Sequence, residues 1–213
     1  MKRIPQICVL FFLMLASANA QTILNKLSVE GGVGYSGAMQ PYLTRYNSNF
    51  SGFTHFDLGV RYMFNEYYGI KASFASDRFE NDPSGKIGTD FQRYSVEGVV
   101  NVGKLFDLTY RTRDNFGLLA HAGFGFATLK PFSATEAEHV APISIGLTPQ
   151  YRLSNKVALY SDFTLFSNVK QEYRFDGSLI QAPYKTPTIG HYYNFSLGLI
   201  FYLGEGKYHS DWY

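Results

Sequence analysis

A run of glycines is the first feature of this sequence with a chemical meaning. Gly32-Val33-Gly34-Tyr35-Ser36-Gly37 has the spacing of a dinucleotide fingerprint, and Asp57 lies twenty residues beyond its last glycine. That chemistry requires a strand followed by a helix whose amino end holds the pyrophosphate. A loop containing Pro41 follows instead, so we expect no nucleotide and no other cofactor here.

The histidines offer a second candidate chemistry. His55, His121, His139, His191 and His209 are scattered and lack the paired spacing of a zinc site. A hydrolytic site would combine a histidine with a serine and an acid, and His121 has such neighbours. A barrel enzyme of that kind must reach lipid, whereas His121 falls on the polar face of its segment. We therefore expect no catalytic residue and no metal ligand.

The elements that carry these residues alternate between apolar and polar positions, which is the period of a β-strand. In the first, Leu27, Val29 and Val33 oppose Ser28 and Glu30. Pro149 must interrupt the hydrogen bonding of the sixth. Eight segments show this period, at residues 27–36, 55–64, 68–75, 93–102, 118–127, 143–152, 157–165 and 193–203.

One face of these strands is apolar and aromatic, and the other carries Gly, Ser, Thr and charge. An Arg or Lys exposed to lipid at mid-bilayer costs about 2–4 kcal/mol. Arg61, Lys71, Arg93 and Arg152 all lie on the polar face, so the apolar face must meet lipid. The sequence thus predicts an all-β fold, an eight-stranded antiparallel transmembrane up-and-down β-barrel. A soluble periplasmic ligand-binding barrel with the opposite faces remains the alternative fold.

The amino terminus predicts export. Lys2 and Arg3 precede an apolar run and the small-residue pattern Ala18-Asn19-Ala20, as in a cleaved signal peptide. We expect a signal peptide at 1–20, an outer-membrane β-barrel at 21–204 and a short periplasmic tail at 205–213. Without Lys2 and Arg3 the chain has 17 basic and 17 acidic residues, a balance that argues against a nucleic-acid partner.

The connections alternate in length. Asn65–Tyr67 and Ser154–Lys156 are short turns, and Gly103–Asn115 is longer than expected for that end of the barrel. Long loops are expected at Gly37–Thr54, Glu80–Asp90, Pro131–Ala141 and Asn168–His191, and an even strand count places both termini in the periplasm. Aromatic and basic loop residues could touch lipopolysaccharide or a partner: Tyr42, Tyr46, Phe50, Phe53, Lys170, Tyr173, Arg174, Phe175, Tyr184 and Lys185.

Charges inside the lumen are the best-founded internal feature. Glu30, Arg61 and Lys71 should lie at similar depth on adjacent strands, with Glu97 slightly higher, and buried charges must be paired. We expect this lumen charge cluster to be a structural plug, with a gate for a small conducting path as the alternative. Other lumen-facing residues are Asp57, Arg93, His121, Arg152 and Asp162.

Three segments carry a resemblance to a known family: Ser28–Tyr35, Gly146–Tyr151 and Ser196–Leu203. The chain resembles the outer-membrane β-barrel family that includes the amino-terminal barrel of OmpA and OmpX-like proteins. The last strand resembles the family's assembly signal, which the barrel-insertion machinery reads by strand addition; its positions here are Ser196, Gly198, Phe201 and Leu203. The residues from Gly206 to Tyr213 look like the start of a linker, and peptidoglycan anchoring is not implied.

These patterns favour a structural protein of a Gram-negative outer membrane, with possible adhesion through loops or weak pore activity. The expected partners are outer-membrane lipid, lipopolysaccharide, the barrel-insertion machinery and periplasmic chaperones. A lipid-modifying barrel enzyme, of the lipid A deacylase or phospholipase type, is the alternative function.

Overall fold

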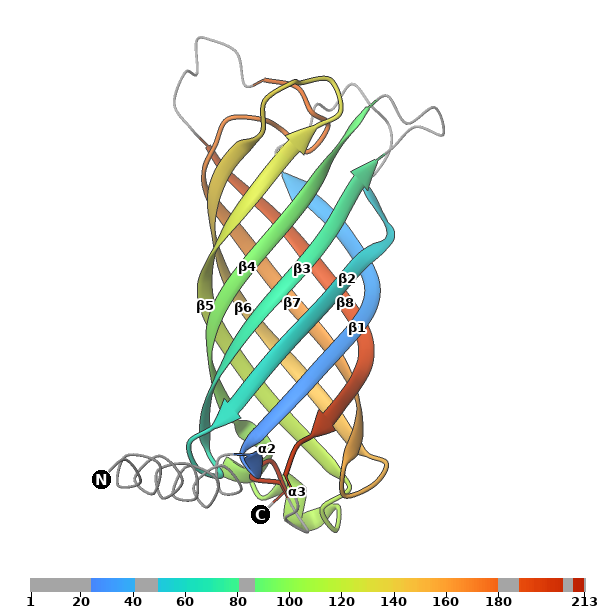
Figure 1. The fold of residues 1–213 in the computed structure, drawn as a ribbon, viewed down its shortest axis with the longest axis vertical. Helices are drawn as coiled ribbons and strands as arrows, with labels where there is room; N and C mark the ends of the chain where they lie inside the picture. Colours follow the sequence, from blue (N-terminus) through green and yellow to red (C-terminus); the bar gives the residue numbers. More distant parts are fainter. Residues whose placement is uncertain (1–23, 41–49, 81–86, 180–187, 205–208, 213) are drawn as a thin grey trace, which may run out of the picture.

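The computed structural model describes residues 24–40, 50–80, 87–179, 188–204 and 209–212. Eight antiparallel strands pair in chain order and β8 closes onto β1 (Figure 1). The predicted eight-stranded barrel is therefore confirmed. The strands are β1 (Leu27–Gln40), β2 (Ser51–Met63), β3 (Tyr68–Glu80), β4 (Gly88–Asn101), β5 (Phe116–Pro131), β6 (Glu138–Arg152), β7 (Val157–Gln171) and β8 (Thr188–Tyr202).

The two faces of the wall follow the alternation of the sequence. Val33 is 64% exposed and Ile145 is 63% exposed on the outside, whereas Ser28 and Arg61 are buried on the inside. A soluble barrel would bury its apolar face and expose its polar one. The observed arrangement is the reverse, with an apolar exterior as a membrane barrel requires.

Pro149 interrupts hydrogen bonding on one side of β6 only. The β6–β7 pairs run from Leu147–Phe163 to Gln150–Tyr160 and skip the two positions between them. On the other side, Pro149 still lies opposite Leu118 of β5. Thr148 keeps the inward direction that the strand alternation gives it, and its hydroxyl donates to Asp162 at 2.6 Å.

Three connections lie at the end of the barrel where β1 begins and β8 ends, called here the turn end (Figure 1). The side chain of Asn65 accepts the backbone N–H groups of Tyr67 and Tyr68, which fixes the first turn. Ser154 does the same for Lys156 and Val157 in the third.

The middle connection differs from a simple turn. Residues 102–115 form two single-turn helices, α2 (Val102–Leu105) and α3 (Leu108–Arg111). The Asn101 side chain caps α2 by accepting the N–H of Lys104 at 3.0 Å. The unexpected length of this connection is thus explained by helical turns that the β-strand period does not reveal.

The opposite end, called here the loop end, has longer strands than predicted. β3 continues to Glu80, β5 to Pro131 and β7 to Gln171. The connection that follows each of these strands is therefore shorter than expected. Parts of the expected long loops, including Tyr42, Tyr46, Tyr184 and Lys185, lie outside the described residues, as does the expected signal peptide. Among the described residues, no helix is long and apolar enough to cross a membrane.

Candidate functional site: the barrel lumen

The lumen contains three linked groups of charged side chains, and the first lies at the turn end. Arg61 of β2 contacts Glu30 of β1 at 3.3 Å, and Lys71 of β3 contacts the other carboxylate oxygen of Glu30. All three are buried. Arg61 stands opposite Lys71 in the strand register, so both cations need the carboxylate of Glu30. This is the grouping that strand geometry predicts for these three residues.

Glu97 belongs to a second group, although it stands opposite Lys71 in the register. Its carboxylate contacts the His121 Nδ1 at 3.2 Å and accepts the Ser144 hydroxyl at 2.7 Å. The four residues expected to form one cluster therefore remain neighbours. Glu97 lies opposite Lys71 across β3 and β4, while its carboxylate also contacts His121 and Ser144.

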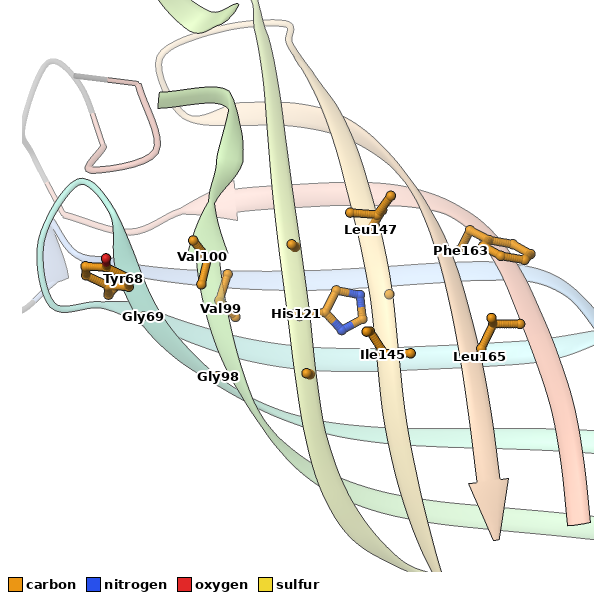
Figure 2. Close-up of a pocket in the computed structure, with 13 residues that line it drawn as sticks. Tyr68, Gly69, Gly98, Val99, Val100, His121, Ile145, Leu147, Phe163 and Leu165 are labelled. Atoms are coloured by element: carbon orange, nitrogen blue, oxygen red, sulfur yellow. The ribbon is translucent and has the colours of Figure 1, made fainter. Parts of the chain in front are cut away.

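His121 lies between two carboxylates. Its Nε2 atom contacts Asp162 at 2.9 Å, opposite the Nδ1 contact with Glu97. Carboxylate oxygens only accept hydrogen bonds, so a doubly protonated imidazolium would present a positive charge and an N–H group to each carboxylate. Figure 2 shows His121 on β5 beside Ile145 and Leu147 of β6, which are exposed on the exterior, whereas His121 is buried. A Cβ atom at Gly146 would overlap the imidazole, which explains the glycine there.

The third group is nearer the loop end and repeats this arrangement. His55 lies between Asp77, at 2.7 Å from Nδ1, and Asp57, at 3.3 Å from Nε2. Arg93 stands 3.7 Å from the second oxygen of Asp77 and donates to the Tyr192 hydroxyl at 2.6 Å. Asp57, Arg93, His121 and Asp162 thus all face the lumen, and each has a charged partner.

Sequence reasoning missed His55, Asp77, Tyr160 and Tyr192 as members of these groups. Asp77 lies beyond the predicted end of the third strand, yet it continues the inward positions Lys71, Ser73 and Ala75. Extending the period by one step would have found it. The same step beyond Asn194 places Tyr192 inward, but the sequence interpretation expected aromatic residues to face outward.

Aromatic side chains close the lumen at the loop end. Phe50, Phe79, Phe91, Phe166, Phe175 and Tyr192 are all buried and form the loop-end aromatic cluster. Phe166 and Tyr192 stack at 4.6 Å, and the Arg93 guanidinium lies 3.8 Å from the Phe166 ring centre. Phe50 and Phe175 were expected to be available to loop partners; the structure instead places them inside, where they shield the third charged group from water.

Arg152 lies at the turn end, half-buried, with its guanidinium 5.6 Å from the ring of Trp212. Trp212 is buried inside this end of the barrel together with His209, Ser210 and Asp211. Burial opposes the charged form of Asp211, but the adjacent Arg61 outweighs it and lowers the pKa of Asp211 below its ordinary value. The expected linker-like tail thus contributes a carboxylate to the lumen.

The last strand presents its predicted assembly positions on both faces. Ser196 and Gly198 are inward, Phe201 is exposed on the exterior, and Leu203 follows the strand with its N–H bonded to the Leu27 carbonyl. No cluster of three or more potential metal ligands occurs in the described part of the chain.

Comparison with known proteins identifies the family. The family model described as the outer membrane protein beta-barrel domain matches residues 7–201. The chain belongs to this family. No curated protein matches this outer-membrane barrel.

Comparison with solved structures supports the fold through Neisserial surface protein A. Neisserial surface protein A has a TM-score of 0.56 at 11% identity, over 84% of this chain and 97% of that one. The amino-terminal β-barrel domain of OprF from Pseudomonas aeruginosa has a TM-score of 0.46 at 10% identity, over 83% and 96%. At 11% identity, the likeness of Neisserial surface protein A to this outer-membrane barrel concerns the fold alone.

Proposed function

We propose that this outer-membrane barrel is a structural, non-conducting component of the envelope, with its termini in the periplasm and its loop end outward. The observation that carries the proposal is the filled lumen: charged side chains are bound to one another, with aromatic rings above them and Trp212 below. A water-filled path would require these pairs to separate. Separating them is costly, because a buried charge without its partner is strongly unfavourable.

Planar lipid bilayers test the non-conducting part. We expect purified, folded protein to give no conductance above that of lipid alone, with a general porin as the positive control. Reproducible steps in conductance would overturn this proposal. They would favour the alternative in which the lumen charges gate a small conducting path. A gene deletion should make cells more sensitive to detergents, and restored expression should reverse this.

The same lumen argues against a lipid-modifying enzyme. His121 is buried, and the hydroxyl and carboxylate groups around it face inward, away from any bilayer substrate. Incubation with labelled lipopolysaccharide or phospholipid should therefore release no fatty acid. Release above a heat-denatured control would contradict this.

We also propose that lipopolysaccharide contacts the loop end. Lys130 and Lys170 are both exposed there, where ammonium groups can meet lipid phosphates. Lys130→Gln with Lys170→Gln should reduce the lipopolysaccharide that copurifies with the barrel. Lys156→Gln, which removes an exposed lysine at the turn end, is the matched control and should have no effect.

A further inference from the structure

Residues 209–212, which follow β8 in the chain, lie inside the barrel at the turn end. His209, Ser210, Asp211 and Trp212 are all buried, and Asp211 has no exposed surface. We call these four residues the tail plug. Its backbone makes a tight turn in which the Trp212 N–H donates to the His209 carbonyl at 3.0 Å. A solvated tail would show neither this burial nor this turn.

Three strands supply polar partners for Asp211. The Arg61 guanidinium of β2 contacts its carboxylate at 2.6 Å, and the Tyr202 hydroxyl of β8 donates to the same oxygen at 3.1 Å. The Asn101 side chain at the end of β4 donates to its backbone carbonyl at 3.0 Å. Asn101 also caps α2, so one amide group joins the tail plug to the helical connection.

Aromatic contacts hold the residues on either side of Asp211. The His209 ring stacks on Tyr202 with ring centres 4.5 Å apart, and Trp212 packs edge to face against Tyr202 with ring centres 6.3 Å apart. Arg152 covers the indole ring, and a Cβ atom on Gly117 would lie 3.2 Å from it. The barrel therefore presents a shaped site for an acidic residue followed by an aromatic one.

The charge balance at this end also depends on the tail plug. Arg61 and Lys71 both contact Glu30, so two buried cations share one carboxylate of the wall. Asp211 supplies the second negative charge. Without it, Arg61 would keep only its 3.3 Å contact with Glu30, which Lys71 also contacts. Loss of the nearer partner of a buried cation favours capture of another carboxylate.

We propose that the turn end of the lumen is a binding site for an acidic–aromatic peptide segment, and that the tail plug occupies it as a releasable seal. Its partner is this chain's own His209–Trp212. The same chemistry would accept that segment from a second copy when the first is displaced. The seal lies at the opposite end from the loop-end aromatic cluster and is independent of it.

Trp212 is the single tryptophan of the chain, so its fluorescence reports directly on the tail plug. In the folded protein we expect blue-shifted emission that is poorly quenched by iodide. Asp211→Asn should shift the emission to the red and increase quenching severalfold. Asp107→Asn, the same change at an exposed turn-end residue, should change neither signal. Wild-type quenching equal to that of free tryptophan amide would overturn the proposal without any variant.

A labelling experiment distinguishes release of the seal from general loosening of the barrel. Ser28 and Ser36 are both fully buried lumen residues of β1, the first at the turn end and the second at the loop end. In a Cys8→Ser background, Asp211→Asn should increase labelling of Ser28→Cys by a charged thiol reagent and leave Ser36→Cys unlabelled. Unchanged labelling at both positions, or an equal rise at both, would refute the proposal.

Discussion

The Tyr160 hydroxyl of β7 donates a 2.8 Å hydrogen bond to Asp57 of β2, across the interior of the barrel. The ring fits because two facing residues have no side chain. A Cβ atom on Gly32 would lie 2.5 Å from the Tyr160 hydroxyl, and one on Gly198 would lie 2.6 Å from the ring. Glycines of the apparent nucleotide fingerprint and of the assembly strand therefore share a packing role: they make room for a cross-barrel contact.

Gly198→Ala should destabilise the barrel, because the added methyl group meets both Tyr160 and the backbone of β1. We expect a loss of about 1–3 kcal/mol, as is usual for overpacking. Urea unfolding of the protein in lipid vesicles measures it. Gly98→Ala is the control, since the nearest atom to its Cβ is 3.8 Å away. Equal stability of the two variants would contradict the packing role of Gly198.

Glu30→Gln and Arg61→Ala should not act independently. Each removes one side of a buried ion pair, so a double-mutant cycle should give a coupling energy of roughly 0.5–3 kcal/mol. The free energies of unfolding of the four proteins provide the measurement. Additive effects would show that the two charges do not stabilise one another.

His121→Leu should be among the most destabilising lumen substitutions. It leaves Glu97 and Asp162 buried without the imidazole between them, a change that typically costs about 3–5 kcal/mol. Adding Asp162→Asn should restore part of the loss, because one uncompensated charge is removed. If the double variant were less stable than the single one, the charge explanation would be wrong.

Ile145→Arg tests which side of the wall meets lipid. Ile145 is the central residue of β6 and is exposed on the exterior, so an arginine there should cost about 2–4 kcal/mol. Leu153→Arg, in the following turn at the edge of the barrel, should cost close to nothing. Stability would be compared in vesicles, and equal losses at the two depths would refute the assignment.

Acid should release the tail plug. The folded-state pKa of Asp211 is lowered from its ordinary value of 3.8, so its contribution is present above pH 4 and is lost as the pH falls through the folded pKa. Trp212 emission should therefore shift to the red as the pH falls below about 4. Asp211→Asn should lack this acid-dependent change in emission. A change of the same size in both proteins would show that a group other than Asp211 causes it.

The membrane-spanning half of this fold could be predicted because one physical rule governs it. Residues such as Val33 and Ile145 must face lipid, while Arg61 and Lys71 must not, so a period of two fixes the strands, their faces and the pairing of Glu30. The same rule locates His121 and Asp162 in the lumen. It does not predict which neighbouring side chains the Glu97 carboxylate contacts, because that depends on side-chain reach across two strands.

The rule reverses near the loop end, which explains the main errors there. Phe79 and Phe91 point inward, while Arg78, between Glu80 and Asp90 on the exterior, is half exposed. Beyond the bilayer, the outside of a wall can be polar and the inside has to be closed. The period of two persists with its polarity exchanged, so an interpretation that assigns every aromatic ring to lipid misplaces these residues. The tail plug carries no such period, and only its packing reveals it.

Arg61 and Asp211 are separated by 150 positions in the chain, yet they form one buried ion pair. Such a contact can form only after almost every intervening strand has found its neighbour, since the pocket around Asp211 is built from β2, β4 and β8. Its appearance should therefore be a late kinetic event, slower than the pairing of adjacent hairpins. The time course of Trp212 emission during refolding would then report when the barrel is complete.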